Sequence, residues 1–184
     1  WSLTTAFDIS TATHDGAFPI SGQEIRANSV AFNNDGTRMF VVGAGNMSQH
    51  RIHEYSLSTP YDLSSTVTHL NTEDLSSSHN YLDGITFKDD GTKMFIINGN
   101  QNTISQFKLT TPYDASTLSL EGSFDVSSYD TEAREMAFSN DGSKMFFIGD
   151  ANDKVFEFNL SCNWSVIDGA CDDPVGKYEG GKDH

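Results

Sequence analysis

A short segment that occurs three times places the strongest constraint on what this chain can fold into. Each copy predicts a strand end, a two-residue Asp-Gly turn and a hydrophobic strand. Asp-Gly between apolar runs is the strongest short signal for a β-hairpin, because Gly adopts the required positive φ without a Cβ clash. The copies are Asn33–Gly43 (NNDGTRMFVVG), Lys88–Gly99 (KDDGTKMFIING) and Ser139–Gly149 (SNDGSKMFFIG), with the turn residues Asp35, Gly36, Asp90, Gly91, Asp141 and Gly142.

A second marker repeats with the same period. A segment of small polar residues between two aromatics follows each hairpin, and one further copy opens the chain. The last aromatics of these four segments are Phe7, Tyr61, Tyr113 and Trp164, which lie 54, 52 and 51 residues apart. The turn glycines Gly36, Gly91 and Gly142 lie 55 and 51 residues apart. Two independent markers that keep one period indicate a repeat protein.

Each repeat predicts four strands. The third strand alternates apolar and polar residues, as in Tyr55 and Leu57 against Glu54 and Ser56, which is typical of a half-buried strand. The fourth is more polar, as expected of an outer edge strand. Four antiparallel strands in roughly 50 residues are typical of one β-propeller blade, and the whole chain is predicted to be all-β. The expected strands are 29–32, 38–42, 51–57 and 66–70, then 85–87, 93–97, 103–109 and 118–124, then 136–138, 144–148 and 154–160.

The two markers also carry a resemblance. The segments AFNNDGTRMFVVG, ITFKDDGTKMFIING and MAFSNDGSKMFFIG, with the pattern D-G-[TS]-[KR]-M-F, resemble WD40-like propeller repeats such as the YVTN, NHL and PD40 groups. Together with the pattern [ST]-T-P-Y-D, they are most similar to repeats of bacterial or environmental proteins of unassigned role. The resemblance implies the fold and little about function. The Gly-His and Trp-Asp marks of true WD40 repeats are absent, so the scaffolding role of that family is not implied.

The repeats predict a propeller region over residues 1–165, with units at about 6–57, 60–109 and 112–160, and an irregular tail over 166–184. Trp1 aligns with the middle of a third strand, and an outer strand is expected at about Thr11–Ile20. Closed propellers have roughly four to eight blades, so about three units leave open edges. Three outcomes stay open. The chain is a piece of a longer propeller, two copies close a ring by exchanging the N-terminal outer strand, or the exchange builds a filament.

Composition excludes some function classes. The chain has 26 acidic and 11 basic residues and a net charge of −15, which argues against partners such as nucleic acid and anionic membrane surfaces. No segment approaches the roughly 20 apolar residues of a membrane-spanning helix, so membrane insertion is not expected. The chain starts with Trp1 instead of Met, so we expect that a leader or upstream region was removed or omitted.

No catalytic residue is predicted. G-x-S-x-G is absent, no Ser, His and Asp set can be selected, and acidic pairs occur by chance among so many carboxylates. No cofactor is expected either. Binding of Ca²⁺ at Asp35, Asp90 and Asp141 is the minority interpretation, since the ligand pattern of an EF-hand is missing and Asp in a turn hydrogen-bonds its own backbone.

Two cysteines and three sequons point to the outside of the cell. Cys162 and Cys171 could close a small disulfide loop, which would imply an oxidising compartment. Asn46, Asn159 and Asn163 fit the glycosylation pattern, although such short sequons are common by chance. We therefore expect an extracellular or cell-surface protein.

These observations favour a non-catalytic structural or interaction module that associates with itself through blade edges. The alternative is a lectin-like propeller that stacks glycans on the recurring aromatics. If those aromatics bind sugar, Tyr61→Ser should abolish binding without lowering the melting temperature, whereas a packing role predicts lower stability. A propeller hydrolase or lyase is the third possibility, and it rests on fold analogy alone.

Overall fold

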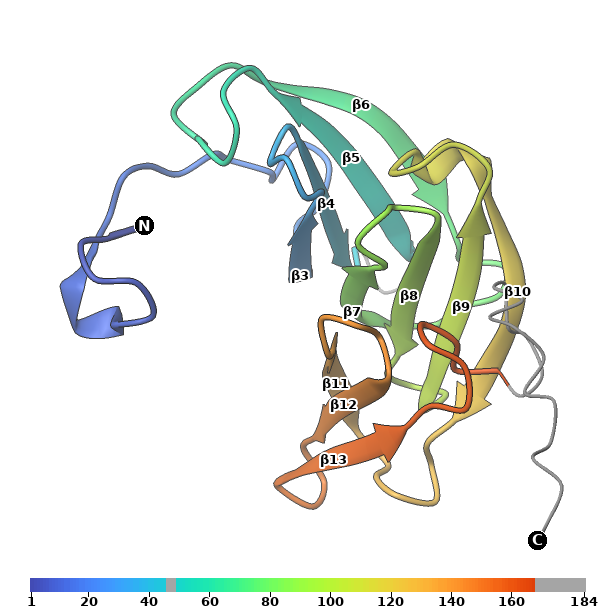
Figure 1. The fold of residues 1–184 in the computed structure, drawn as a ribbon. Coiled ribbons are helices and arrows are strands. Elements are labelled where there is room, and N and C mark those ends of the chain that lie inside the picture. The colour runs from blue at the N-terminus through green and yellow to red at the C-terminus, as the bar shows by residue number, and fades with distance from the viewer. Residues whose placement is uncertain (46–48, 168–184) are drawn as a thin grey trace, which may run out of the picture.

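The computed structural model describes residues 1–45 and 49–167. They form three larger twisted antiparallel sheets that stand side by side (Figure 1) and a small two-stranded sheet near the N-terminus. Sheet 1 has the order β3-β4-β5-β6, sheet 2 has β7-β8-β9-β10 and sheet 3 has β11-β12-β13. The chain therefore fills each sheet from its inner to its outer strand before it enters the next one, and the predicted all-β fold of four-stranded antiparallel units is confirmed.

Most strand positions agree with the repeat pattern. The bounds are β3 Ala27–Phe32, β4 Arg38–Gly43, β5 Arg51–Leu57, β6 Val67–Asp74, β7 Leu82–Phe87, β8 Lys93–Asn98, β9 Thr103–Leu109, β10 Leu118–Asp125, β11 Ala133–Phe138, β12 Lys144–Gly149 and β13 Lys154–Asn159. The inner strands start earlier than predicted because each continues through a register shift, between residues 27 and 29, 82 and 84, and 133 and 135.

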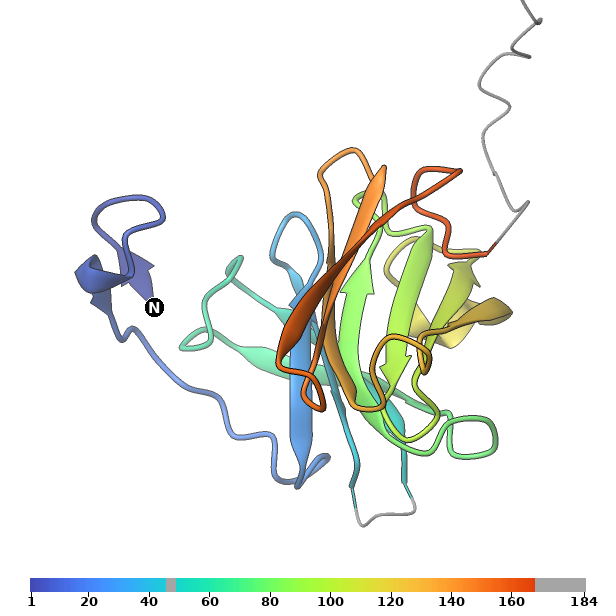
Figure 2. The ribbon, with the colours of Figure 1, turned by 90° about the horizontal axis from the view of Figure 1, so that it is seen from below.

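The N-terminal segment stands apart from the three sheets (Figure 2). It holds β1 (Ser2–Leu3), the 3-10 helix η1 (Ile9–Thr11) and β2 (Ala12–Thr13). The expected outer strand at about Thr11–Ile20 is therefore wrong over most of its length. A strand needs a neighbour for its backbone hydrogen bonds. Within residues 11–20 of the described structure, only Ala12 and Thr13 have a strand partner, and that partner is β1.

The hairpin loops are longer than the two-residue turns predicted from sequence. In sheet 1 the last strand pair is Phe32 with Met39, and Gly36 N donates to Asn33 O at 3.0 Å. The positive φ expected at glycine is present, at 71°, 71° and 69° in Gly36, Gly91 and Gly142. The loop is longer because the chain first makes the turn closed by the bond from Gly36 N to Asn33 O, and the glycine at its end is left-handed. A turn followed by a left-handed residue is a common hairpin connection.

Apolar side chains from facing sheets form the core. One cluster joins sheets 1 and 2 and includes Phe40, Ile52, Met94 and Phe107. A second joins sheets 2 and 3 through residues such as Phe95 and Phe147, and its members also include Trp164. A third lies on the other side of sheet 1, around Met39, Val41 and Tyr55. The hydrophobic contacts that hold the fold together are therefore mostly contacts between neighbouring sheets.

Along the described part of the chain, no helix is long and apolar enough to cross a membrane.

Candidate functional site

The inner strands β3, β7 and β11 lie next to one another and carry polar residues at equivalent positions (Figure 1). Asn28, Asp83 and Arg134 each occupy the register shift of their strand, where no partner residue stands opposite. A β-bulge turns a side chain away from the regular alternation of a strand. The three sheets thereby present one polar residue each to a shared location.

Asp83 connects the other two. Asn28 Nδ2 donates to Asp83 Oδ1 at 3.2 Å and to the Leu82 carbonyl at 2.9 Å. Arg134 Nη1 donates to Asp83 Oδ2 at 3.4 Å. The carboxylate of sheet 2 thus accepts hydrogen bonds from sheets 1 and 3, and each contact spans one repeat.

Burial makes this carboxyl group unusual. Asp83 is only 7% exposed. Burial raises the pKa of its carboxyl group to about 6, and the nearby carboxylates of Glu135 and Glu132 act in the same direction, while Arg134 opposes them. Desolvation disfavours the charged form of an acid, so Asp83 can gain and lose a proton close to neutral pH.

A second contact crosses sheet 2 entirely. Ser29 Oγ donates to Glu135 Oε2 at 2.7 Å, which joins sheets 1 and 3 directly. The strand between them carries Gly84 at this level, and a Cβ there would lie 2.6 Å from Glu135 Oε1. Glycine is therefore needed for the close approach of the three inner strands. We refer to Asn28, Ser29, Asp83, Arg134 and Glu135 as the inner-strand cluster.

Two cavities adjoin the cluster, and Glu135 lines both. One has a volume of about 460 Å³ and is lined by Asn28, Ser29 and apolar residues of sheet 1, including Val30 and Met39. The other has a volume of about 380 Å³ and lies between the inner strands. Polar groups beside a cavity with an apolar wall are the usual setting of a small-molecule site.

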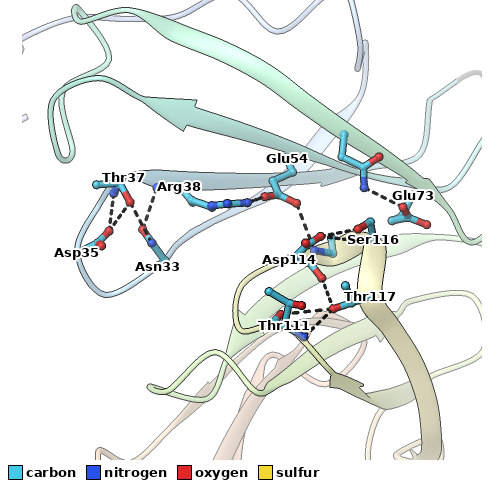
Figure 3. A network of polar contacts seen from close by, with 12 residues as sticks. Asn33, Asp35, Thr37, Arg38, Glu54, Glu73, Thr111, Asp114, Ser116 and Thr117 are labelled. Carbon is cyan, nitrogen blue, oxygen red and sulfur yellow. Dashed lines mark hydrogen bonds and ion pairs between the residues drawn. The ribbon is translucent and has the colours of Figure 1, made fainter.

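A separate polar network joins sheet 1 to the loop that precedes β10 (Figure 3). Arg38 pairs with Glu54, whose Oε2 accepts the Ala115 N–H at 3.2 Å at the start of η2 (Ala115–Thr117). Glu54 is 1% exposed, and burial raises the pKa of its carboxyl group. Sheet 2 makes the equivalent contact with an amide, since Gln106 Oε1 accepts the Val166 N–H at 2.9 Å. This repeated contact is structural, because its oxygen satisfies a buried backbone N–H.

None of the predicted turn residues belongs to the inner-strand cluster. Asp35, Asp90 and Asp141 each accept the backbone N–H of the residue two positions later, at 2.9–3.0 Å. They belong to three separate hairpins. Across residues 1–45 and 49–167, no three His, Cys, Asp or Glu side chains are grouped so that they could hold a metal ion. Calcium binding stays an untested prediction.

The other predicted sites are only partly described. Cys162 is buried, but Cys171 lies outside the described residues, so the disulfide stays a prediction. Asn46 also lies outside them. Asn159 and Asn163 are exposed, and Asn163 Nδ2 donates to the Asp141 carbonyl at 2.9 Å. Glycosylation at these positions is likewise untested.

The recurring aromatics do not form a platform. The rings of Tyr61, Tyr113 and Trp164 lie against Gly36, Gly91 and Gly142, each within the same sheet. The structure supports the packing role for these three residues. Each ring covers a turn glycine of its own sheet, and Tyr113 and Trp164 also pack in the clusters that join neighbouring sheets. Phe7, the fourth member, is fully exposed.

Sequence reasoning missed the inner-strand cluster. One signal was available, because Asn28, Asp83 and Arg134 occupy the same position of the repeat, immediately before the apolar part of each inner strand. Three different polar residues at a position that precedes a buried strand indicate a role other than packing.

Comparison with solved structures supports the propeller fold. The periplasmic gluconolactonase PpgL of Pseudomonas aeruginosa aligns with a TM-score of 0.53 and 21% identity over 72% of this chain and 35% of that chain. The corresponding values are 0.52, 18%, 75% and 46% for a luciferin-regenerating enzyme. They are 0.50, 9%, 73% and 40% for the Cps50 (Swd1) β-propeller domain of Myceliophteria thermophila. This chain thus spans less than half the length of the structures it resembles.

No protein-family model matches the sequence, and a comparison with curated proteins finds no match. The propeller-like fold is therefore shown by structural likeness alone, and the assignment to WD40-like repeat groups stays a prediction.

The same neighbours correct the prediction that this protein is not an enzyme. Two of them are enzymes with a similar fold. The prediction relied on the lack of a catalytic motif in the sequence. In a propeller, residues that meet at one site come from different blades and lie about 50 residues apart in this chain, as Asn28, Asp83 and Arg134 do. Such a site leaves no short motif, so the lack of one excludes nothing.

Proposed function

We propose that this chain forms part of a β-propeller hydrolase in which the inner-strand cluster acts on a small polar ester of the lactone class. The observation that carries the proposal is Asp83, a buried carboxyl group with a pKa raised to about 6 that is held between Asn28 and Arg134. Perturbed acids are typical of catalytic sites, and Asp83 is hydrogen-bonded to Asn28, which lines the 460 Å³ cavity. The gluconolactonase name belongs to a neighbour, and it suggests the substrate class.

The proposed step is general base catalysis of hydrolysis. Ionised Asp83 removes a proton from a water molecule while the water oxygen forms a bond to the carbonyl carbon of the ester. The guanidinium of Arg134 lies beside the carboxylate and stabilises the negative charge that develops on the carbonyl oxygen. The carbon–oxygen bond of the ester then breaks, and the departing oxygen takes the proton back from Asp83.

The direct test is hydrolysis of gluconolactone, measured against its spontaneous opening in the same buffer. Asp83→Asn should lower the enzymatic rate by about a hundredfold, because the amide cannot accept the proton. Asp125→Asn is the matched control, since Asp125 is an exposed residue of β10 that caps Ser127 N at 2.8 Å, a role that Asn also fills. Equal rates for the natural chain and Asp83→Asn would refute the proposed role.

We propose self-association as a second function, because the two ends of the row of sheets both expose apolar side chains. On the far side of sheet 3, Ile148 is 45% and Val155 is 70% exposed. At the other end, Val30 of sheet 1 is 54% exposed beside the 460 Å³ cavity. The equivalent residues of sheet 2, Ile97 and Ile85, are nearly inaccessible. Sheet 3 of one copy could therefore pack on sheet 1 of another as neighbouring sheets do within the chain.

A polar contact fits the same arrangement. Glu157 of β13 occupies the repeat position of Glu54 and Gln106, which accept a backbone N–H from the next sheet. In sheet 1 the equivalent N–H is that of Leu63, for which the described residues provide no acceptor. Head-to-tail packing of two copies would bring Glu157 to this group and give a ring of about six sheets, within the usual range of propellers.

Light scattering over a concentration series tests this second function. The natural chain should be larger than a monomer, and the double variant Ile148→Ser and Val155→Ser should shift it toward the monomer. A monodisperse monomer at every concentration would exclude both the closed ring and the filament. We keep the extracellular or cell-surface location as part of this proposal, and one neighbour is periplasmic by name.

A further inference from the structure

Three loops of this protein place an aromatic side chain on a hairpin turn in the same way. The backbone N–H of Tyr61, Tyr113 and Trp164 donates to the carbonyl of the turn glycine at 2.9, 3.0 and 2.9 Å. Each aromatic has a positive φ of 55–57°. Its ring then covers the glycine so closely that a Cβ on Gly36, Gly91 or Gly142 would lie 2.1–2.2 Å from a ring atom.

The N-terminal segment contains a fourth loop with the same internal structure. Phe7 has a φ of 62°, and Asp8 N donates to Thr5 O at 3.1 Å. The matching bond in sheet 2 joins Asp114 N to Thr111 O, also at 3.1 Å. The following side-chain contacts agree as well, since Asp8 Oδ1 accepts the Ser10 N–H at 3.0 Å, as Asp114 Oδ1 accepts the Ser116 N–H.

This fourth loop lacks the turn that the other three cover. Phe7 is 102% exposed, and within the described residues its N–H has no acceptor. A positive φ is unfavourable for a residue with a side chain, and such strain persists where the surrounding structure imposes it. Here the bonds of the loop itself impose it. The Phe7 loop thus has the conformation with which the other three loops cover a hairpin turn, but it covers no turn in the described structure.

We propose that the Phe7 loop is a docking element for the Asp-Gly hairpin of an additional blade of this same repeat type. The N–H of Phe7 would donate to the carbonyl of the turn glycine, and the ring would cover that glycine. A second copy of this chain does not supply the partner, because its three hairpins are already covered by Tyr61, Tyr113 and Trp164. The partner is therefore a blade whose hairpin has no aromatic of its own.

The chemistry of the contact defines what the partner must carry. Glycine is required at the turn, because any Cβ would occupy the space of the ring. Tyr61 and Tyr113 also donate their hydroxyl groups to carbonyls of the turn, at 2.8 and 2.6 Å. Phe7 has no hydroxyl group, so its recognition depends on the glycine face and on one backbone hydrogen bond.

The test supplies such a hairpin in front of the full chain. A copy of residues 75–106 is placed before Trp1, which keeps the repeat spacing because Trp1 and Phe107 are equivalent. Hydrogen exchange at the Phe7 amide should slow by about tenfold or more relative to the natural chain, because the amide becomes hydrogen-bonded. The same extension with Gly91→Val in the added copy is the matched control, and it should leave the exchange fast.

Fast exchange at Phe7 in the extended chain would overturn the proposal, whether or not the added strands fold, because the loop would have failed to bind a hairpin of its own repeat. Equal protection with and without Gly91→Val would also overturn it, since the contact would then not involve the glycine face. If Phe7→Ser weakened association of the natural chain, the partner would be a second copy, which the proposal excludes. None of these outcomes bears on Asp83 or on lactone hydrolysis.

Discussion

Sheets 2 and 3 carry equivalent pairs of apolar residues on the same face, and one pair is buried while the other is exposed. Ile97 pairs with Ile104 across β8 and β9, and both are completely buried. Ile148 pairs with Val155 across β12 and β13, and they are 45% and 70% exposed. The strands and their register are alike. The difference is that sheet 3 covers this face of sheet 2, while no described residue covers the face of sheet 3 in the same way.

The comparison shows that a sheet of this protein contains only part of its own core. Each sheet offers two apolar faces and buries a face when a neighbour packs on it, as expected of repeat architectures. The following predictions test how far stability and chemistry depend on a neighbour.

Matched truncations of the two isoleucines should give the largest difference. Ile97→Ala should lower the free energy of unfolding by about 3 kcal/mol, because it leaves a cavity between sheets 2 and 3. Ile148→Ala should cost less than about 1 kcal/mol, because the side chain is half exposed. Urea denaturation at low protein concentration measures both. Similar losses would show that the face of sheet 3 is covered in solution.

Asp83 of sheet 2 and Arg134 of sheet 3 occupy equivalent positions, but only Asp83 should make the stability of the protein depend on pH. The pKa of Asp83 is raised from 3.8 to about 6 in the folded protein, whereas the partly exposed Arg134 stays charged. The folded state therefore holds the proton more tightly than the unfolded state. The resulting stability is fully present below pH 3.8 and is lost as the pH rises through about 6. The loss should amount to at most about 3 kcal/mol.

Asp83→Asn should remove this pH dependence, since an amide does not titrate. Urea denaturation of both proteins at several values between about pH 4 and pH 7 would show it, because linkage ties the slope to the difference in bound protons. Parallel curves for the two proteins would mean that Asp83 has an ordinary pKa, and the proposed general base would lose its main support.

Substitution of a turn-covering aromatic should have a smaller effect on stability, and Phe7, which covers no turn in this structure, serves as the control. Tyr113→Ser should lower the free energy of unfolding by about 2 kcal/mol, since the ring packs on Gly91 and Phe87 and its hydroxyl group bonds the Asp89 carbonyl. Phe7→Ser should leave the melting temperature unchanged, because Phe7 contacts no turn in this structure. A clear loss of stability from Phe7→Ser would contradict the exposed position of the ring.

The smallest effect is expected at the junction shown in Figure 3. Glu54→Gln keeps the oxygen that accepts the Ala115 N–H, and Gln106 already performs this role toward Val166 in the next sheet. The variant should therefore unfold within about 1 kcal/mol of the natural chain, while Glu54→Ala should cost more because it leaves a buried N–H without an acceptor. Thermal denaturation of the two variants separates these cases.

The sequence was sufficient for the strands and for the order in which they occur. Local patterns determine these features: the repeated segment D-G-[TS]-[KR]-M-F marks the hairpins, and alternation marks strands such as Arg51–Leu57, whose bounds were predicted to the residue. The predicted outer strand at about Thr11–Ile20 was wrong. Its composition suits an outer strand, but a strand forms only beside a neighbouring strand, and a local sequence pattern does not show whether that neighbour is present.

The inner-strand cluster could not be predicted from local sequence patterns either, because its residues come from distant parts of the chain. Ser29 and Glu135 are 106 residues apart and meet only because Gly84 lets three strands approach. The raised pKa of Asp83 depends on burial, which is a property of the packed sheets. Asp83 is followed by glycine, as the Asp residues of the turns are, so an Asp-Gly pair alone does not distinguish it from them.

The contact between an aromatic and a turn glycine also bears on how the chain folds. Tyr61 follows Gly36 by 25 residues, and Tyr113 and Trp164 follow their glycines by 22. Contacts so near in sequence lose little chain entropy when they form, and proteins rich in such contacts fold fast. In each repeat the contact between the aromatic residue and the turn glycine can thus form soon after the strands of that repeat have been synthesised. The slow events are expected to be those that join separate repeats, above all the meeting of Ser29 with Glu135.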